Sequence, residues 1–452
     1  MNKQKWIIIG AVALTVIVGI LLIVSFINSG GDNNSNNDNN DDDNNNNNSA
    51  VVLEYWGLWE SEEVMQPLID EYQDENPNVT IKYTQKSFTQ YEENVYTRIE
   101  QGSIEGTPAP DIFRMNNTWL PKFQKYLSPV PEAVYSSAEY SDTFYPTAKA
   151  DLTGTNQNLY AIPLEIDGLA LFYNKEILAS AGVDAPPTDW DSLIELSKEL
   201  TVRDGSGQIT QAGISMGSAD NVVHSADILS LLMLQNGAEI NQNFNTEVDL
   251  DSDRAVSAMN FYVDFLAEHQ TWSADLPNDL EMFYSGKLAM MFGPSWRAFD
   301  ILNANPRLEF GIATTPIIVD EELYYSMYWA EAVSAKSDNQ AEAWKFIGWL
   351  SEQAQLKKFY SNSSEVRAFG EPYSRESMGS ELADQPYVAA IIEMAPNMTA
   401  WKMGEQTYIE QRLRDAITDV AENNVQAEQA LFEAEEDINE RLADLFATEE
   451  ES

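Results

Sequence analysis

The sequence predicts an α/β protein with a body of two domains, and three observations lead to this. At 452 residues the chain is too long for one ordinary domain and suits two, with accessory segments. Hydrophobic residues make up 44% of it, which is enough to bury a real core. From residue 51 onward, short apolar runs alternate with amphipathic segments of helical period, as in sheets whose strands are joined by helices.

The first 49 residues are predicted to tether this body to a membrane. Residues 1–5 carry two lysines and form a cytoplasmic stub, and the uncharged run over 6–27 is long enough to be a transmembrane helix. Residues 28–49 contain only Asn, Asp, Ser and Gly, so we expect a disordered linker. The alternative is a cleaved signal peptide, for which Asn28-Ser29-Gly30-Gly31 is a weak cleavage site.

The body begins with a strand–helix–strand unit, which is typical of parallel pairing. Residues 51–56 read as a buried strand, a helix follows over 61–75 with Ser61 as its N-cap, and 79–83 is a second strand. The same alternation continues, with a helix near 89–101, strands over 108–113 and 169–173, and helices over 189–200, 225–235 and 253–267. In such sheets ligands bind at the carboxyl ends of the strands.

The C-terminal stretch over 405–446 is acidic and helical. It has one apolar stripe on each side of Asn423-Asn424. Neither stripe lasts three clean heptads, so two amphipathic helices that pack back on the body are favoured over a coiled coil with a partner.

Composition excludes several classes of function. The formal charge of −47 disfavours nucleic-acid binding, which needs a basic surface. The chain has no cysteine and only two histidines, so we expect no disulfide, no metal and no cofactor. Asp249, Asp251 and Asp253 mimic the opening of a calcium loop, but Arg254 stands where that loop needs glycine, which favours a capped helix start.

A series of short motifs lies in a characteristic order along residues 51–446. They are Tyr55-Trp56-Gly57, residues 106–112, Tyr160-Ala161-Ile162-Pro163, residues 171–176, residues 186–190, residues 283–290, Gly293-Pro294-Ser295-Trp296 and residues 341–346. Each motif alone is weak, but their joint order and spacing resemble the maltose-binding-like extracellular solute-binding proteins of ABC importers.

The resemblance implies a two-lobed, type II periplasmic-binding-protein-like architecture whose lobes close on a ligand by hinge motion. The implied lobes are residues 51–166 with 310–355 and residues 167–309 with 356–446, with chain crossings near 164–168, 306–312 and 350–365. The resemblance also implies a monomer that captures a small polar solute, a mono- or short oligosaccharide, and delivers it to the membrane subunits of an ABC importer.

A sugar site needs aromatic rings for stacking, together with carboxylates, amides or arginine for hydrogen bonds. The candidates follow strands or lie near crossings, and each could instead serve core packing, helix capping or a salt bridge. They are Trp56, Trp59, Glu60, Asn116, Asn117, Trp119, Asp167, Trp296, Trp329, Glu331, Arg367 and Trp401, with Glu165 as a second carboxylate beside Asp167. The resemblance supports Asp167 as a ligand carboxylate and Trp296 as a stacking residue.

Two other functions fit the same composition. An extracellular glycoside hydrolase also combines aromatics with paired carboxylates, and among 73 acidic residues such pairs arise by chance. A surface adhesin or scaffold would need no closing cleft. Release of reducing ends would identify a glycoside hydrolase. A lack of response to small molecules would identify an adhesin or scaffold. We expect a binding protein and not an enzyme, with no catalytic residues.

Overall fold

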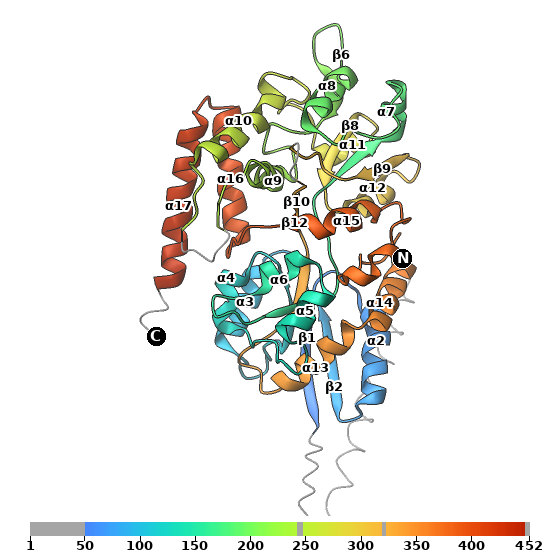
Figure 1. The fold of residues 1–452 in the computed structure, drawn as a ribbon, viewed down its shortest axis with the longest axis vertical. Coiled ribbons are helices and arrows are strands. Elements are labelled where there is room, and N and C mark those ends of the chain that lie inside the picture. The colour runs from blue at the N-terminus through green and yellow to red at the C-terminus, as the bar shows by residue number, and fades with distance from the viewer. Residues whose placement is uncertain (1–49, 242–246, 319–321, 448–452) are drawn as a thin grey trace, which may run out of the picture. The chain divides into compact units, whose positions relative to one another are not determined.

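The computed structural model describes residues 50–241, 247–318 and 322–447. These residues belong to one compact unit with two five-stranded sheets and a small two-stranded sheet (Figure 1). The predicted anchor and linker lie outside the described residues. Within the described ranges, no helix is long and apolar enough to cross a membrane.

The first sheet has the strand order β2-β1-β3-β11-β4 and forms the centre of what we call lobe 1. Its strands are β1 (Val51–Gly57), β2 (Val79–Gln85), β3 (Ile112–Asn116), β4 (Ala161–Pro163) and β11 (Trp329–Val333). β1 is parallel to β2 and β3, as the predicted unit requires, whereas β11 is antiparallel to its neighbours. The accompanying helices are α2 (Glu62–Glu75), α3 (Tyr91–Gln101), α4 (Leu120–Phe123), α5 (Ser137–Thr143), α6 (Pro146–Leu152), α13 (Gln340–Leu350) and α14 (Gln353–Val366).

The second sheet has the order β6-β7-β8-β5-β9 and forms the centre of lobe 2. Its strands are β5 (Ala170–Asn174), β6 (Val202–Arg203), β7 (Ile209–Ile214), β8 (Leu288–Gly293) and β9 (Phe310–Ala313). Every residue of β8 is buried, which is typical of a central strand covered on both faces. The accompanying helices are α7 (Lys175–Ser180), α8 (Trp190–Leu200), α9 (Ser225–Gln235), α10 (Asp253–Ala267), α11 (Asp279–Tyr284) and α12 (Arg297–Ala304).

Helix limits follow the local sequence signals. α9 and α10 have the limits that the sequence predicts. The Asp189 side chain caps α8 by accepting from the Ser192 N–H at 2.8 Å, and Ser252 caps α10. The capped helix start predicted after Asp251 is therefore confirmed. Ser61 has the extended backbone of an N-cap of α2, but its side chain makes no capping bond.

The chain segments that connect the two sheets are hydrogen-bonded to one another. The first of these segments lies between β4 and β5. Within it, Leu169 N donates to Tyr325 O at 2.9 Å and Ile166 N donates to Pro372 O at 3.0 Å. The small parallel sheet of β10 (Tyr324–Tyr325) and β12 (Met398–Thr399) joins two of these segments.

Two predicted lobe boundaries are corrected. Residues 310–313 form β9 and pair with β5 in the second sheet, so the chain returns to lobe 1 only after β9 and before β11. Residues 356–366 belong to α14, which packs on α2, where Asn362 Nδ2 donates to Val64 O at 3.0 Å. The reason is physical: edge pairing with β5 and packing on α2 decide these positions, and neither leaves a local sequence signal.

The C-terminal helices α16 (Gln406–Ala421) and α17 (Ala427–Ala447) pack side by side and against α9 and α10 of lobe 2 (Figure 1). The apolar stripe of each helix is buried, for example at Leu413 and Ile438. The prediction that this stretch folds back on the body is confirmed.

Candidate functional site

The site forms where the loops at the carboxyl ends of the strands meet. In lobe 1, the carboxyl ends of β1, β2 and β3 share one edge because these strands are parallel. Trp59 follows β1, Phe88 follows β2 and Trp119 follows β3. Trp329 reaches the same edge because it opens the antiparallel strand β11, opposite the last residue of β3. In lobe 2, Trp296 follows the carboxyl end of β8.

These five aromatic side chains, which we call the aromatic cluster, touch across the two lobes. The Trp59 ring stacks on Trp296 with centroids 6.3 Å apart and planes 21° apart. It also meets Trp329 edge-on at 5.8 Å and Phe88 at 5.2 Å, and Trp119 meets Trp329 edge-on at 5.3 Å. Trp59 is 40% exposed and Phe88 59% exposed, so both side chains are accessible to solvent. Aromatic rings can stack on the apolar C–H face of a small ring.

A buried ion network around Arg114 holds the lobe 1 side of the cluster. Arg114 of β3 is 2% exposed, its Nε donates to Glu331 Oε1 at 2.8 Å, and its guanidinium also pairs with Glu60. Burial alone would raise the pKa of Glu60, but the charges of Arg114 and then Arg367 bring it below its usual value. Glu60 adjoins Trp59, and Glu331 lies in the strand that Trp329 opens. One arginine therefore fixes two of the tryptophan-bearing segments.

Arg367 extends this network into the segment after α14. Its guanidinium pairs with Glu371. Burial would lower the pKa of Arg367, but the charges of Glu371 and then Glu60 raise it. Arg367 is thus placed next to the predicted site residue Glu60, with its own charge already engaged by a carboxylate.

Asp167 and Glu165 in the first crossing each hold a loop of the site. The Asp167 carboxylate accepts from the Ser295 backbone N–H at 3.1 Å and from its hydroxyl at 2.8 Å, directly before Trp296. Glu165 accepts from the Trp329 N–H at 2.6 Å. Burial raises the pKa of Asp167 to about 7 and that of Glu165 well above its usual value. The crossing is therefore tied to one tryptophan-bearing segment in each lobe.

Arg297 and His224 hold the lobe 2 side of the cluster. The guanidinium of Arg297 lies 4.2 Å from the centroid of the Trp296 ring, and His224 meets that ring edge-on at 6.1 Å. Arg297 Nε donates to His224 Nε2 at 3.0 Å, so the imidazole carries its proton on Nδ1 and donates it to Asp227 at 2.8 Å. Burial, together with the Arg297 charge, lowers the pKa of His224 to about 3. Burial also raises the pKa of Asp227 to about 7.

Four predicted site residues belong neither to the aromatic cluster nor to the charged groups that hold it. Asn116 accepts from the backbone N–H and the hydroxyl two residues further on, and Asn117 Nδ2 donates to Asp151 at 2.9 Å. Trp401 is fully buried, with its indole N–H donated to a buried serine hydroxyl at 3.1 Å. Trp56 is half-buried under a lysine ammonium group 3.9 Å from its ring centroid. Ligand contacts by these four residues stay predictions that their present contacts do not favour.

Several residues of the site were not predicted from the sequence. Tyr91 lies 6.4 Å from Trp329 and donates its hydroxyl to Arg114 O at 2.8 Å. Phe88 lies in a segment without helical or strand periodicity. It could have been identified only from its place in a loop that follows a strand, because such loops converge in this fold. Arg114 did leave a signal, because a guanidinium inside an otherwise apolar strand needs buried carboxylate partners.

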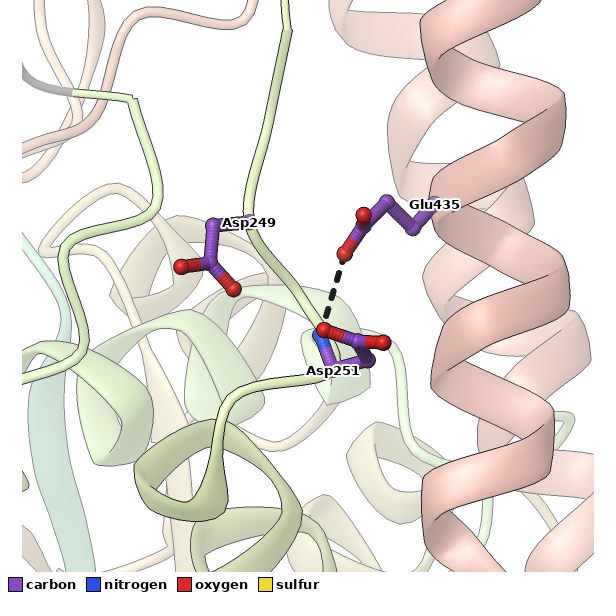
Figure 2. A group of neighbouring side chains, drawn as sticks. All are labelled: Asp249, Asp251 and Glu435. Carbon is purple, nitrogen blue, oxygen red and sulfur yellow. Dashed lines mark hydrogen bonds between the residues drawn. The ribbon is translucent and has the colours of Figure 1, made fainter.

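A separate group of carboxylates involves none of these residues. Figure 2 shows Asp249, Asp251 and Glu435 of α17, whose carboxylate oxygens lie within 4.8 Å of one another. Glu435 accepts from the backbone N–H groups of Leu250 at 2.7 Å and Asp251 at 3.1 Å. Both aspartates are exposed. These contacts fasten α17 to the segment that precedes α10.

The family model of the bacterial extracellular solute-binding proteins matches residues 59–357, a span that includes strands of both large sheets and all members of the aromatic cluster. The chain belongs to this family. Like its relatives, this solute-binding protein is a binding protein and not an enzyme, as the sequence predicts, and its body is an extracellular solute-binding domain.

Individual relatives are distant in sequence. The multiple sugar-binding protein of Streptococcus mutans is 23% identical over 336 residues, which cover 69% of this chain and 73% of that protein. A putative binding protein of Brucella abortus is 22% identical over 298 residues, which cover 64% of this chain and 69% of that protein. The solved structure of the sugar-binding protein MalE from Xanthomonas citri superposes with a TM-score of 0.71 at 19% identity, over 89% of this chain and all of that one. This likeness establishes the periplasmic-binding-protein-like fold.

Proposed function

We propose that the solute of this binding protein is a sugar, either a monosaccharide or a short oligosaccharide, which it captures for an ABC importer. The observation that carries the proposal is the stack of Trp59 on Trp296, with Trp329 against its edge. Three partly exposed indoles that meet across two lobes suit a small ring with apolar faces. The buried carboxylates and arginine beside them can orient polar groups at its edge. Relatives whose names state a sugar, such as the multiple sugar-binding protein, add support.

Capture proceeds by closure of the lobes in this proposal. A ring held between two aromatic faces needs two contacts of about 3.5–4.0 Å each, which sum to roughly 7–8 Å. The stacked rings of Trp59 and Trp296 are 6.3 Å apart, so a sugar enters between them only if the lobes first separate and the 40%-exposed Trp59 ring makes room for it when they close again. A solute that contacts both lobes then favours the closed population, because it makes its full set of contacts only there.

A thermal-shift screen tests the sugar assignment. The chain is heated with maltotetraose, tagatose, other mono- and disaccharides, amino acids, polyamines and anions in turn. A solute that binds only the folded state raises the melting temperature, by an amount that grows with concentration over its Kd. We expect a sugar to give the largest shift. A shift with an amino acid or polyamine and with no sugar would overturn the assignment.

We further propose that residues 6–27 anchor the protein as a single-pass helix, with residues 28–49 as the spacer that holds the body outside the cell. The uncharged run, with lysines before it and aspartates after it, supports this orientation. The anchored protein should keep its N-terminus, fractionate with membranes and be cut by external protease. A mature N-terminus near residue 30 in the soluble fraction would contradict the anchor and favour a cleaved signal peptide. We propose a monomer, because one chain supplies every contact of the site.

A further inference from the structure

The start of α16 connects lobe 2 to lobe 1. α16 and α17 pack on α9 and α10 of lobe 2 (Figure 1). The residues at the start of α16, however, form hydrogen bonds with the loop after β3. Gly404 N donates to Thr118 O at 2.9 Å, and Gln406 Oε1 accepts from Trp119 Nε1 at 2.9 Å. Thr407 Oγ1 donates to a carboxylate of α3 at 3.2 Å. We call residues 404–407 the clasp.

An ion network reinforces the clasp. Lys122 of lobe 1 is 3% exposed, and its Nζ lies 3.5 Å from Glu405 Oε1 and 3.1 Å from Glu92 Oε1. Arg441 of α17 donates to both Glu405 oxygens, at 2.6 and 2.8 Å. Burial would raise the pKa of Glu405, but Arg441 and then Lys122 bring it below its usual value. Glu405 is therefore a carboxylate anion shared between a lysine of lobe 1 and an arginine of the C-terminal helix pair.

The clasp also sets the orientation of one member of the aromatic cluster. Trp119 packs edge-on against Trp329 at 5.3 Å and is 2% exposed. An indole has a single N–H donor, and Gln406 accepts it. The Gln406 amide is held in turn by donating to Glu410 Oε1 at 2.6 Å. A ring fixed in this way presents one defined edge to Trp329.

We propose that the clasp holds the two lobes closed around the aromatic cluster and that Gln406 is a positioning residue for Trp119. Gln406 acts through Trp119 and does not itself contact the solute. Separation of the lobes breaks the Trp119–Gln406 bond and the Lys122–Glu405 pair, so capture and clasp closure favour each other. The effect of the clasp on solute binding rests on the proposed function. The contacts of the clasp do not, because they form in the structure without a ligand.

The first test needs no solute. The full chain, in detergent, is labelled with ¹⁵N-tryptophan, and the indole signal of Trp119 is assigned by its loss in Trp119→Phe. Gln406→Met removes the acceptor, so this one signal should shift and its N–H should exchange with solvent at least about tenfold faster. The matched control is Gln411→Met on the exposed face of the same helix, where the amide bonds only to Asp415, and it should leave the signal in place.

A second measurement reports on closure. The native chain has no cysteine, so spin labels can be placed at Glu75→Cys on lobe 1 and Glu199→Cys on lobe 2, both exposed. Gln406→Met and Lys122→Met should each increase the long-distance population relative to Gln411→Met. An unchanged Trp119 signal together with an unchanged distance distribution in both variants would overturn the clasp.

Maltotetraose is the probe for the solute arm. Gln406→Met should raise its Kd about 5–10-fold, and Gln411→Met should not. If native protein ignores maltotetraose while the indole and distance results hold, the clasp stands and the sugar proposal loses support for this ligand. If native protein binds maltotetraose and Gln406→Met binds it equally well, the positioning role is wrong.

Discussion

On the lobe 1 side of the aromatic cluster, the tryptophan-bearing segments are held by a charged arginine between two carboxylates, whereas on the lobe 2 side Trp296 is held by a chain of Arg297, His224 and Asp227. The first arrangement is a buried ion network in which burial raises the pKa of Glu331, while the charge of Arg114 helps to bring that of Glu60 below its usual value. The second depends on an imidazole that stays neutral, next to a carboxyl group whose pKa is about 7. Both fix indole rings, and in the second the pKa of Asp227 places the titration of its carboxyl group in the neutral range. The two sides therefore hold their indole rings by different electrostatics: a guanidinium between two carboxylates in lobe 1, and a neutral imidazole beside a carboxyl group in lobe 2.

The largest effect is expected from removal of the central arginine of lobe 1. Arg114→Met leaves Glu60 and Glu331 buried without their cation and should lower the free energy of unfolding by about 3–5 kcal/mol. Arg297→Met is the counterpart in lobe 2 and should cost about 1 kcal/mol, because Arg297 is only partly buried. Urea unfolding measures both. Equal losses in the two variants would show that the two halves do not differ as argued.

Removal of the stacking ring tests whether both halves serve the solute. Trp296→Ala should weaken sugar binding by roughly 1–3 kcal/mol, the scale of a lost buried aromatic contact. The control is Trp349→Phe on α13, a partly buried indole that packs on Tyr72 outside the cluster. Titration calorimetry with the sugar found by thermal shift gives both values. Unchanged affinity in a folded Trp296→Ala protein would assign that ring to packing alone.

A pH series measures the contribution of the buried carboxyl groups to stability. Asp167 and Asp227 have pKa values of about 7 in the folded chain, against about 3.9 when unfolded, so the folded state binds more protons between these values. Their contribution is present at acidic pH and is lost as pH rises through 7. His224, with its pKa lowered to about 3, acts in the opposite direction below its usual pKa of about 6.5.

Burial also raises the pKa of Glu410 to about 8 and that of Asp151 to about 6, and both act in the same direction as Asp167 and Asp227. Because these carboxyl groups outweigh one imidazole, the free energy of unfolding should fall by at least about 2 kcal/mol from pH 5.5 to pH 8. Melting temperatures across this range measure it, and Asp227→Asn should flatten the slope. A slope that is the same in Asp227→Asn would remove Asp227 as its source.

The smallest effect is expected at an exposed charge of lobe 1. The ammonium group of Lys86 lies 3.9 Å from the Trp56 ring centroid, at a partly exposed position. Lys86→Ala should therefore cost about 0.5–1 kcal/mol of stability and leave sugar affinity unchanged. If Lys86→Ala lowered the free energy of unfolding as much as Arg114→Met, burial would not explain the difference in stability between the two variants.

The sequence predicted the helices and strands better than the contacts between distant parts of the chain. The limits of α9 and α10 and the cap of α8 follow from neighbouring residues, so local chemistry sufficed. Trp59, Trp119, Trp296 and Trp329 could be singled out because strand-end loops converge in α/β sheets. The pairing of Arg114 with Glu331, 217 residues away, could not be predicted, because it depends on the register between β3 and β11.

Strand β11 lies inside the first sheet, between β3 and β4, although it is synthesised after every strand of the second sheet. Lobe 1 therefore cannot complete its sheet until more than 300 residues have been made. Until β11 has been made, the sheet, the Arg114 network and the position of Trp329 all stay incomplete, because each depends on residues of this strand.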